Sequence, residues 1–284
     1  IESKLNPKIF YDDIKNINQN KSLIKVQCEK ESFFATKVLN SVPKFTPHSD
    51  SKSYPLLLQH FKGWTIKTEN NCFKKDEATI MDFTIDQKNE TRFFYVLPKT
   101  ENEALIEFTL FSKNLLNDRE YDVEIKNYLS SLNIDNYKIQ SQEKGVIPMT
   151  CFPFDTYNTK NVINIGTAGG WTKPSSGYTF RYIDKFSNRV VKFLRSDISF
   201  TKFKFRDRYW FYDLIFLDVL YNKNSIGSSL FETMFRKNKF SSVFRFLDNE
   251  GSYLDDFKII NSFPKWIFIK SFIKNLPKIV SNYL

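Results

Sequence analysis

Apolar and polar residues alternate over the middle of the chain, which is the pattern of β-strands with one buried face. Four segments show this alternation: Leu56–Thr68, Ala78–Gln87, Thr91–Leu97 and Ala104–Phe111. A helix is expected next, because Asp118 is a suitable N-cap, Glu120 falls in the first turn and apolar residues then recur at helical spacing. Tyr137–Ser141 and Gly145–Met149 are predicted to be two further strands. The middle of the chain is therefore expected to form an α+β unit.

The regions on either side have different patterns. Ile1–Asn20 is polar with a weak helical spacing, whereas Ser22–Val26 alternates and Glu31–Leu39 ends in a short apolar strand. Pro43–Pro55 contains three prolines and is predicted to be a linker. The C-terminal third is helical in pattern. Within it, Arg208–Tyr221 is almost wholly aromatic and aliphatic, so this helix is expected to be buried.

Half of the eight glycines lie in one short segment, Ile165–Phe180, at positions Gly166, Gly169, Gly170 and Gly177. An apolar run, Val162–Ile165, precedes the segment, and helical spacing follows over Arg181–Leu194. A strand, a glycine-rich loop and a helix start can hold a large anionic ligand, because the backbone is accessible and free N–H groups lie at the helix N-terminus. An ordinary strand-to-helix turn has the same pattern, so the glycines alone leave both interpretations open.

The last segment, Pro264–Leu284, combines a basic stripe with an apolar one. Lys270, Lys274 and Lys278 follow each other at four-residue spacing. Apolar residues lie opposite them: Trp266, Ile269, Phe272, Ile273, Leu276 and Ile279. This pattern is typical of a helix that lies in a membrane interface, and a helix packed on the protein core is the alternative. No run of eighteen uncharged apolar residues occurs, so no membrane-spanning helix is predicted.

The amino-acid composition and net charge favour some classes of function over others. The thirty phenylalanines suit either core packing or a site for a long apolar ligand. The net charge of +10 is interpreted first as compositional drift toward lysine and then as affinity for an anionic membrane. Nucleic acid is disfavoured, because the lysines are scattered among carboxylates and no nucleic-acid-binding module is visible. Three cysteines and two histidines match no zinc or redox spacing: Cys28, Cys72, Cys151, His48 and His60. We therefore predict no metal site and a reducing compartment.

One carboxylate is a candidate for acid–base chemistry. Glu107 alternates with Ile106 and Phe108 in a predicted strand, so it shares a face with the apolar Leu105. Ionising a carboxyl group on an apolar face is costly, which raises its pKa and suits it to act as a general acid. A glutamate that faces solvent at a sheet edge is the alternative. Four other carboxylates are interpreted as solvated or paired side chains: Glu143, Asp184, Asp213 and Asp218.

Several motifs resemble those of one enzyme family. Gly-Thr-Ala-Gly-Gly at 166–170, followed by Pro-Ser-Ser-Gly-Tyr at 174–178, resembles the second flavin-contacting motif of the flavoprotein lycopene cyclases. Pro98 is followed by eight residues and then by Glu107-Phe108-Thr109, which resembles the motif of the family's catalytic carboxylate. Phe108 stands where many members have a second acid. Three more stretches resemble the family in the same order, the last of them its bacterial, flavobacterial-type branch: Met81-Asp82-Phe83, Glu143–Met149 and Arg245–Asp248.

The resemblance implies a fold and a domain order. It implies an FAD-binding, aromatic-hydroxylase-like domain of Rossmann type, with an inserted antiparallel-sheet substrate domain and C-terminal helices. Residues 1–55 and 151–195 would belong to the FAD domain, 56–150 to the substrate domain and 196–284 to a helical region with a membrane-contacting helix at 264–284. Hydroxylases of this fold usually carry Asp where this chain has Thr167. The dinucleotide fingerprint Gly-x-Gly-x-x-Gly is absent, so we expect an N-terminally incomplete sequence.

The resemblance also implies a reaction, the non-redox isomerisation of lycopene or a related acyclic carotene to β-rings. Glu107 would protonate the terminal double bond, and reduced FAD would stabilise the carbocation, with NAD(P)H only as an indirect reductant. The flavin would be held by Gly166, Thr167, Ala168, Gly169, Gly170, Pro174, Ser175, Gly177 and Tyr178. Phe94, Tyr95, Phe108 and Trp171 would line the substrate pocket, and Asp82 would be structural. The expected location is cytoplasmic and peripheral to the membrane, with neither nucleic acid nor a protein partner.

Two other functions remain open at this point. A monooxygenase or isoprenoid reductase of the same fold would need NAD(P)H and would not need a buried Glu107. A basic membrane- or nucleic-acid-binding protein without catalysis would bind no flavin. The preferred carotene, the number of ends cyclised, the ring type and the oligomeric state do not follow from the sequence.

Overall fold

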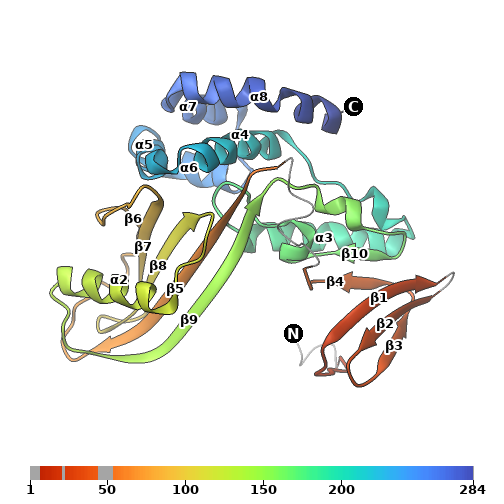
Figure 1. Cartoon of the computed structure of the whole chain (residues 1–284), viewed down its shortest axis with the longest axis horizontal. Helices are drawn as coiled ribbons and strands as arrows, with labels where there is room; N and C mark the ends of the chain where they lie inside the picture. Colours follow the sequence, from red (N-terminus) through yellow and green to blue (C-terminus); the bar gives the residue numbers. More distant parts are fainter. Residues whose placement is uncertain (1–6, 21–22, 44–53, 284) are drawn as a thin grey trace.

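The computed structural model describes residues 7–20, 23–43 and 54–283, which form a mixed α/β fold (Figure 1). Its strands form three sheets. A three-stranded antiparallel sheet has the order β1-β2-β3 (Ile14–Asn20, Leu23–Cys28, Ser32–Ala35). Two strands pair in parallel, β4 (Val38–Asn40) and β10 (Val162–Asn164). The largest sheet has the order β6-β7-β8-β5-β9 (Thr79–Asp82, Thr91–Pro98, Glu103–Ser112, Leu56–Thr68, Tyr137–Thr150).

Strands β4 and β10 pair with each other although a long inserted segment separates them in the sequence. Asn40 at the end of β4 donates a side-chain hydrogen bond to Asn164 at the end of β10, over 2.8 Å. Between these strands lie the five-stranded sheet and α2 (Asp118–Ser131), all within Leu56–Thr150. That stretch is the one that the sequence assigned to a substrate domain. The predicted fold class, with an antiparallel sheet inserted into an α/β unit and helices after it, is confirmed.

The helices after β10 are α3 (Phe180–Ser196), α4 (Arg208–Asn222), α5 (Gly227–Lys237), α6 (Phe240–Leu247), α7 (Tyr253–Ser262) and α8 (Lys265–Tyr283). Of these, α4 and α5 pack on one face of the large sheet, whereas α3 packs near β10. In Figure 1, α7 and α8 form the outermost layer above α4 to α6. The opposite face of the sheet packs against α2, with Phe94, Ile106 and Phe108 buried against Tyr121 and Tyr128. Each face of the sheet therefore has its own apolar core.

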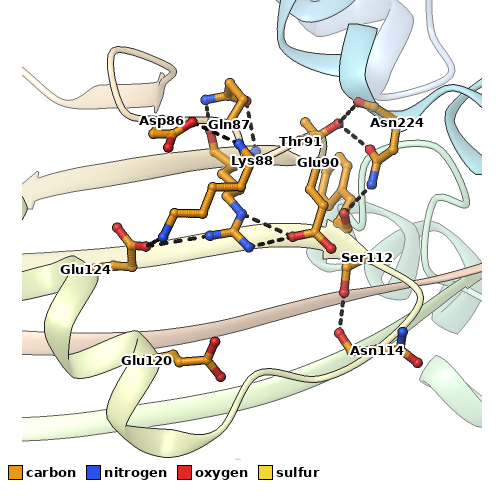
Figure 2. A network of polar contacts seen from close by, with 12 residues as sticks. Asp86, Gln87, Lys88, Glu90, Thr91, Ser112, Asn114, Glu120, Glu124 and Asn224 are labelled. Atoms are coloured by element: carbon orange, nitrogen blue, oxygen red, sulfur yellow. Dashed lines mark hydrogen bonds and ion pairs between the residues drawn. The ribbon is translucent and has the colours of Figure 1, made fainter.

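A network of hydrogen bonds and ion pairs joins the large sheet to the layer of helices α4 to α8, called the helical layer below (Figure 2). Thr91 at the start of β7 donates to the side chain of Asn224 over 2.7 Å, and Asn224 donates to the carbonyl of Phe111 in β8 over 2.6 Å. Asn224 belongs to the short 3-10 helix Asn224–Ile226 that precedes α5. On the α2 side, Arg92 is ion-paired with Glu90 and Glu124. The network contains no group that the proposed chemistry uses, so we interpret it as structural.

Four predictions about elements need correction. Residues 14–20 form a strand and not a helix, because β1 pairs along its length with β2; residues 1–6 lie outside the described part. Only Thr79–Asp82 of the segment Ala78–Gln87 is a strand. The two strands predicted at 137–149 are one continuous strand that pairs with β5. The N-cap of α2 is Asn117, which forms a capping box with Glu120. The predicted linker falls mostly on residues 44–53, outside the described residues.

The side of helix α8 that faces the protein is mixed, since apolar Ile267 and Phe268 pack against the core beside polar Ser271 and Asn275. Both Ser271 and Lys274 donate to the buried Asp218 of α4. Other apolar side chains of the helix face outward, Trp266 and Ile269 among them. The helix is therefore docked on the protein, as one of the two sequence-based alternatives expected, and an apolar stripe remains exposed; contact with a membrane stays a prediction. No helix among the described residues is long and apolar enough to cross a bilayer.

Candidate functional site

Glu107 lies in a row of residues that crosses four strands of the large sheet. Strand pairing places Tyr95 (β7), Glu107 (β8), Gly63 (β5) and Glu143 (β9) next to one another in that order. Because side chains alternate between faces, all four positions point to the side covered by the C-terminal helices. The row thus brings together two carboxylates that are far apart in the sequence.

The glycine at the centre of the row allows the two carboxylates to meet. A Cβ on Gly63 would lie 2.9 Å from Cδ1 of Leu105 and 3.2 Å from Oε1 of Glu143. In its absence the side chains of Glu107 and Glu143 are hydrogen-bonded to each other across β5. A hydrogen bond between two carboxyl groups needs one of them to be protonated. Glu107 is the more buried of the two, and Glu143 is exposed on the edge strand.

The surroundings of Glu107 raise its pKa to about 7. Burial is the main cause, and the hydrogen bond to Glu143 and the negative charge of Glu143 add to it. Thr109 acts in the opposite direction, because its hydroxyl donates to Oε1 of Glu107 over 2.8 Å. A carboxyl group with this pKa holds a proton near neutral pH and can donate it, and Thr109 fixes its orientation.

The glycine-rich segment begins where β10 ends. Its first turn is a short 3-10 helix, Gly166–Gly169. A Cβ on Gly169 would lie 2.3 Å from the carbonyl oxygen of Asn164, so the chain itself needs a glycine there. Gly166 differs, because a Cβ on it would meet no atom within 4 Å, and its φ of +56° is in the left-handed region. Open space therefore lies in front of the backbone at Gly166, where a ligand can approach.

A buried ion pair holds the second half of this segment in place. The Lys173 side chain is fully buried, and its ammonium group lies 2.9 Å from Oδ1 of Asp213 in α4 and 2.9 Å from the side-chain oxygen of Asn249. Ser175 donates to Asp213 over 2.6 Å. Lys173 and Asp213 therefore fix the loop to the helical layer.

The loop also contacts the sheet next to Glu107. Gly177 has a φ of +74°, and a Cβ on it would lie 1.6 Å from the side-chain oxygen of Gln59 in β5. The hydroxyls of Tyr178 and Tyr95 are hydrogen-bonded to each other, and burial raises the pKa of both. Tyr95 is the strand neighbour of Glu107. The predicted cofactor loop and the predicted acid therefore belong to one site.

The residues of this segment fit a polar, planar cofactor such as a flavin. The side-chain oxygens of Gln59 and Ser176 and the indole nitrogen of Trp171 are buried without a hydrogen-bond partner in the described part of the chain. Buried polar atoms normally have partners, so these three suit a ligand with hydrogen-bonding groups. The open space at Gly166 lies in the same segment. Helix α3 begins at Phe180, shortly after Gly177, as the sequence predicted.

Three of the four residues predicted to line a substrate pocket lie elsewhere. Phe94 stacks on Tyr128 at 3.9 Å between ring centroids, and Phe108 packs near Phe94 at 5.1 Å. Both face α2, because they alternate with Tyr95 and Glu107 along their strands. The Trp171 ring packs between α3 and the segment before α4, with Phe186 at 5.4 Å. Only Tyr95 lies on the Glu107 side of the sheet.

The other carboxylates fall into two groups. Asp82 accepts a hydrogen bond from Tyr128 over 2.7 Å and is structural, as the resemblance implied. Asp213 and Asp218 are paired and Asp184 is exposed, which agrees with their interpretation from the sequence. Glu143 is the exception, since its partner is the acid Glu107 itself. The sequence analysis also did not identify Gly63 and Lys173 as site residues. For Gly63, its position in the middle of a predicted strand was a signal; for Lys173 there was none.

Comparison with solved structures finds distant similarities. A geranylgeranyl bacteriochlorophyll reductase-like protein from Thermoplasma acidophilum has 12% identity and a TM-score of 0.43 over 95% of this chain and 68% of its own. Tetracycline destructase Tet(51) has 12% identity and a TM-score of 0.41, over 92% and 66% of the two chains. The halogenase PltM has 10% identity and a TM-score of 0.42, over 83% and 54%. The chain thus spans about two thirds of the destructase and about half of the halogenase.

No curated protein matches the sequence. The family profile described as "Lycopene cyclase protein" matches residues 11–271, which is most of the chain and includes Glu107, Glu143 and the glycine-rich segment. The match runs through both halves of the site described above. The chain belongs to the lycopene cyclase protein family.

Proposed function

We propose that this protein is a lycopene β-cyclase, an isomerase that converts the linear end groups of lycopene or a related acyclic carotene to β-rings. The observation that carries the proposal is the buried carboxyl group of Glu107, whose pKa is raised to about 7 and which is held between Glu143 and Thr109 on the sheet face that adjoins the glycine-rich loop. Family membership supports a carotenoid-related enzyme, and this geometry supports acid–base catalysis within it.

The reaction needs one proton donated and one proton removed. The O–H bond of Glu107 breaks, and a C–H bond forms at the terminal double bond of the substrate. The electrons of the neighbouring double bond form the ring bond and leave a cation in the ring. Loss of a ring proton to the Glu107 carboxylate restores the double bond, so the reaction has no net redox change. Thr109 keeps the carboxyl group oriented throughout, and burial together with Glu143 raises its pKa.

The glycine-rich segment would hold FAD through its loop and its backbone, over Gly166–Gly170 and Pro174–Tyr178. When bound in its reduced form, the flavin supplies a fixed negative charge that stabilises cationic species in an apolar site. Lys173 and Asp213 keep the loop in position for it. NAD(P)H would serve only to reduce the flavin. We also propose that the enzyme works at the cytoplasmic surface of a membrane, because its substrate is a bilayer-soluble hydrocarbon.

The proposal is tested in lycopene-accumulating cells that express the protein, extended at its N-terminus if flavin binding requires it. The wild type is expected to form cyclic carotene, and Glu107→Gln is expected to reduce the yield at least about 100-fold, because the general acid is lost. Glu103→Gln is the control, since Glu103 lies on the same strand but is paired with Lys99.

Conversion by Glu107→Gln at the wild-type level would remove Glu107 from the mechanism. Absence of conversion by a folded, flavin-loaded wild type, together with flavin oxidation that depends on NAD(P)H, would favour an oxidoreductase of the same fold. Salt-sensitive binding to membranes or duplexes by a protein that takes up no flavin would favour a non-catalytic binding protein.

A further inference from the structure

The helical layer encloses an apolar cavity of about 360 Å³. Its walls come from α4 to α8, and most are aromatic or aliphatic side chains, among them Phe211, Phe216, Phe231, Met234 and Phe263. Two buried residues, Ser175 of the glycine-rich segment and Leu247 of α6, also line it. The cavity therefore reaches from the outer helices to the proposed cofactor loop.

The cavity opens between the two outermost helices. Ile260 of α7 and Ile269 and Phe272 of α8 line it, and all three are also exposed to solvent. Residues that line the cavity and are also exposed to solvent lie at its opening. Only Phe263 and Pro264 separate α7 from α8 in the sequence, and the helices form the outer layer in Figure 1.

The surface around the mouth is unusually apolar for an exposed surface. On α7 the side chains of Tyr253, Leu254 and Phe257 are largely exposed, and on α8 those of Trp266 and Ile273 are as well. Within each helix these residues recur at helical spacing, so each helix presents one apolar stripe. Exposed apolar stripes of this kind are typical of a site that contacts another apolar phase.

The charges on these helices favour an anionic bilayer as that phase. Helix α8 contains four lysines and no carboxylate. Lys258, Lys265 and Lys270 are exposed, and Lys270 lies over the Trp266 ring at 5.7 Å. Lysines beside an apolar stripe, with a tryptophan between them, match the headgroup region of an anionic membrane. A protein partner would leave the mouth of the cavity covered.

We propose that the outer face of α7 and α8 lies on an anionic phospholipid bilayer, and that a long hydrocarbon passes from the bilayer into the cavity between these two helices. The identity of the hydrocarbon as a carotene rests on the proposed function. Tyr178 follows Ser175 by three residues and is hydrogen-bonded to Tyr95, the neighbour of Glu107. The loop stretch Ser175–Tyr178 therefore links the cavity wall to the neighbour of the acid, and an end group would reach Glu107 along this stretch while part of the remaining chain stays in the cavity.

Membrane contact can be followed through Trp266. The other three tryptophans, Trp64, Trp171 and Trp210, are buried, whereas Trp266 is 69% exposed. With vesicles of phosphatidylglycerol and phosphatidylcholine, the fluorescence of the full chain is expected to shift to the blue and to be quenched by brominated lipid. The Trp266→Phe variant should lose the change. An emission spectrum that vesicles leave unaltered would overturn the membrane contact.

Two phenylalanines with the same exposure give a matched test of the surface. Phe257 on α7 and Phe34 on β3 are both 66% exposed, but only Phe257 lies on the proposed face. Phe257→Ser is expected to weaken vesicle binding about tenfold, because one aromatic side chain no longer enters the bilayer. Phe34→Ser should bind like the wild type. Equal effects of the two substitutions would contradict the assignment of this face.

The entrance is tested by two isoleucines one turn apart on α8. Ile269 lines the cavity, whereas Ile273 lies on the same apolar stripe outside it. Vesicles that contain lycopene are mixed with each Asp variant in a Glu107→Gln background, and the lycopene transferred per membrane-bound protein is measured by absorption. Ile269→Asp is expected to reduce transfer about tenfold relative to Ile273→Asp. Equal transfer would place the entrance elsewhere, and neither outcome depends on turnover by the enzyme.

Discussion

At the scale of single residues, the site depends on an unequal pair of carboxylates. Glu107 is withdrawn into the protein and Glu143 stays at the sheet edge, although the two are hydrogen-bonded. The negative charge of Glu143 disfavours ionisation of Glu107 and keeps its proton available. In the proposed reaction, proton donation leaves Glu107 negatively charged next to a cation, which favours return of a proton. One glycine, Gly63, makes this arrangement possible.

The pH dependence of the reaction follows from this pair. Since protonated Glu107 is the active form, activity is expected to fall as pH rises through about 7. Glu143→Gln removes a charge that raises the pKa of Glu107, so the fall is expected at lower pH. At pH 8 the variant should be about three- to tenfold less active than the wild type, with similar activity near pH 5. Initial rates on lycopene-containing vesicles between pH 5 and 9 measure this.

A second variant, Gly63→Ala, changes the packing around the two carboxylates without removing a charge. Gly63→Ala keeps both carboxylates but places a Cβ against Glu143, and it should shift the pH profile in the same direction. Superimposable profiles of wild type and Glu143→Gln would mean that burial alone raises the pKa of Glu107.

At the scale of elements, a buried ion pair decides where the cofactor loop lies. Lys173, Ser175 and Asn249 converge on the same small region around Asp213, so the loop, α4 and the connection between α6 and α7 are joined in one place. Neither Lys173 nor Asp213 can reach water, since both are almost completely buried. A charge left alone in such a place is far more costly than the pair.

Lys173→Met is therefore expected to destabilise the protein by about 3–5 kcal/mol, because it leaves Asp213 charged and without its cation. The double variant Lys173→Met/Asp213→Leu should recover most of that loss, since no buried charge remains. Urea unfolding followed by circular dichroism measures both free energies. Flavin binding should stay impaired in the double variant, because the loop has lost its anchor. Similar stability of the single and double variants would show that the ion pair is not the dominant interaction.

The sequence predicted some elements well for a physical reason. The limits of β5 and the face on which Glu107 lies follow from alternation, which is clear where one face is buried. Strand β9 is mostly exposed, so its alternation is weak and its pairing with β5 could not be seen. For that reason Glu143 was interpreted as a solvated or paired side chain and its contact with Glu107 was not predicted. Phe94 and Phe108 were expected to line the substrate pocket, although the same alternation places them on the α2 side.

At the scale of the whole molecule, the site lies where three parts meet: the inserted sheet, the glycine-rich loop and the helical layer. Its geometry therefore depends on how firmly the helical layer is attached to the sheet. Asn224 makes that attachment at the far end of the sheet, with hydrogen bonds to Thr91 and Phe111 (Figure 2). The backbone of Gly227 also lies close to Thr91, since a Cβ on Gly227 would be 1.8 Å from the Thr91 hydroxyl.

Asn224→Ala is expected to destabilise the protein by about 1–3 kcal/mol, because the buried Thr91 hydroxyl and the Phe111 carbonyl lose their partner. Hydrogen exchange should increase first in α5, next to the lost contact. Asn188→Ala is the control, since Asn188 is exposed and bonds only within α3. An exchange increase spread evenly over the molecule would contradict a local role for Asn224.

The parallel pairing of β4 with β10 has a consequence for the order of folding. Asn40 and Asn164 are 124 residues apart, so bringing them together directly would close a long loop at a large entropic cost. The hairpin of β7 and β8 is local and forms at little cost, and the rest of the inserted sheet can be built on it. Once that sheet is formed, its first and last strands, β5 and β9, run side by side and hold β4 and β10 near each other. The glycine-rich segment is thus expected to acquire its shape only after the inserted sheet is complete, and misfolding of that sheet would remove the proposed flavin site.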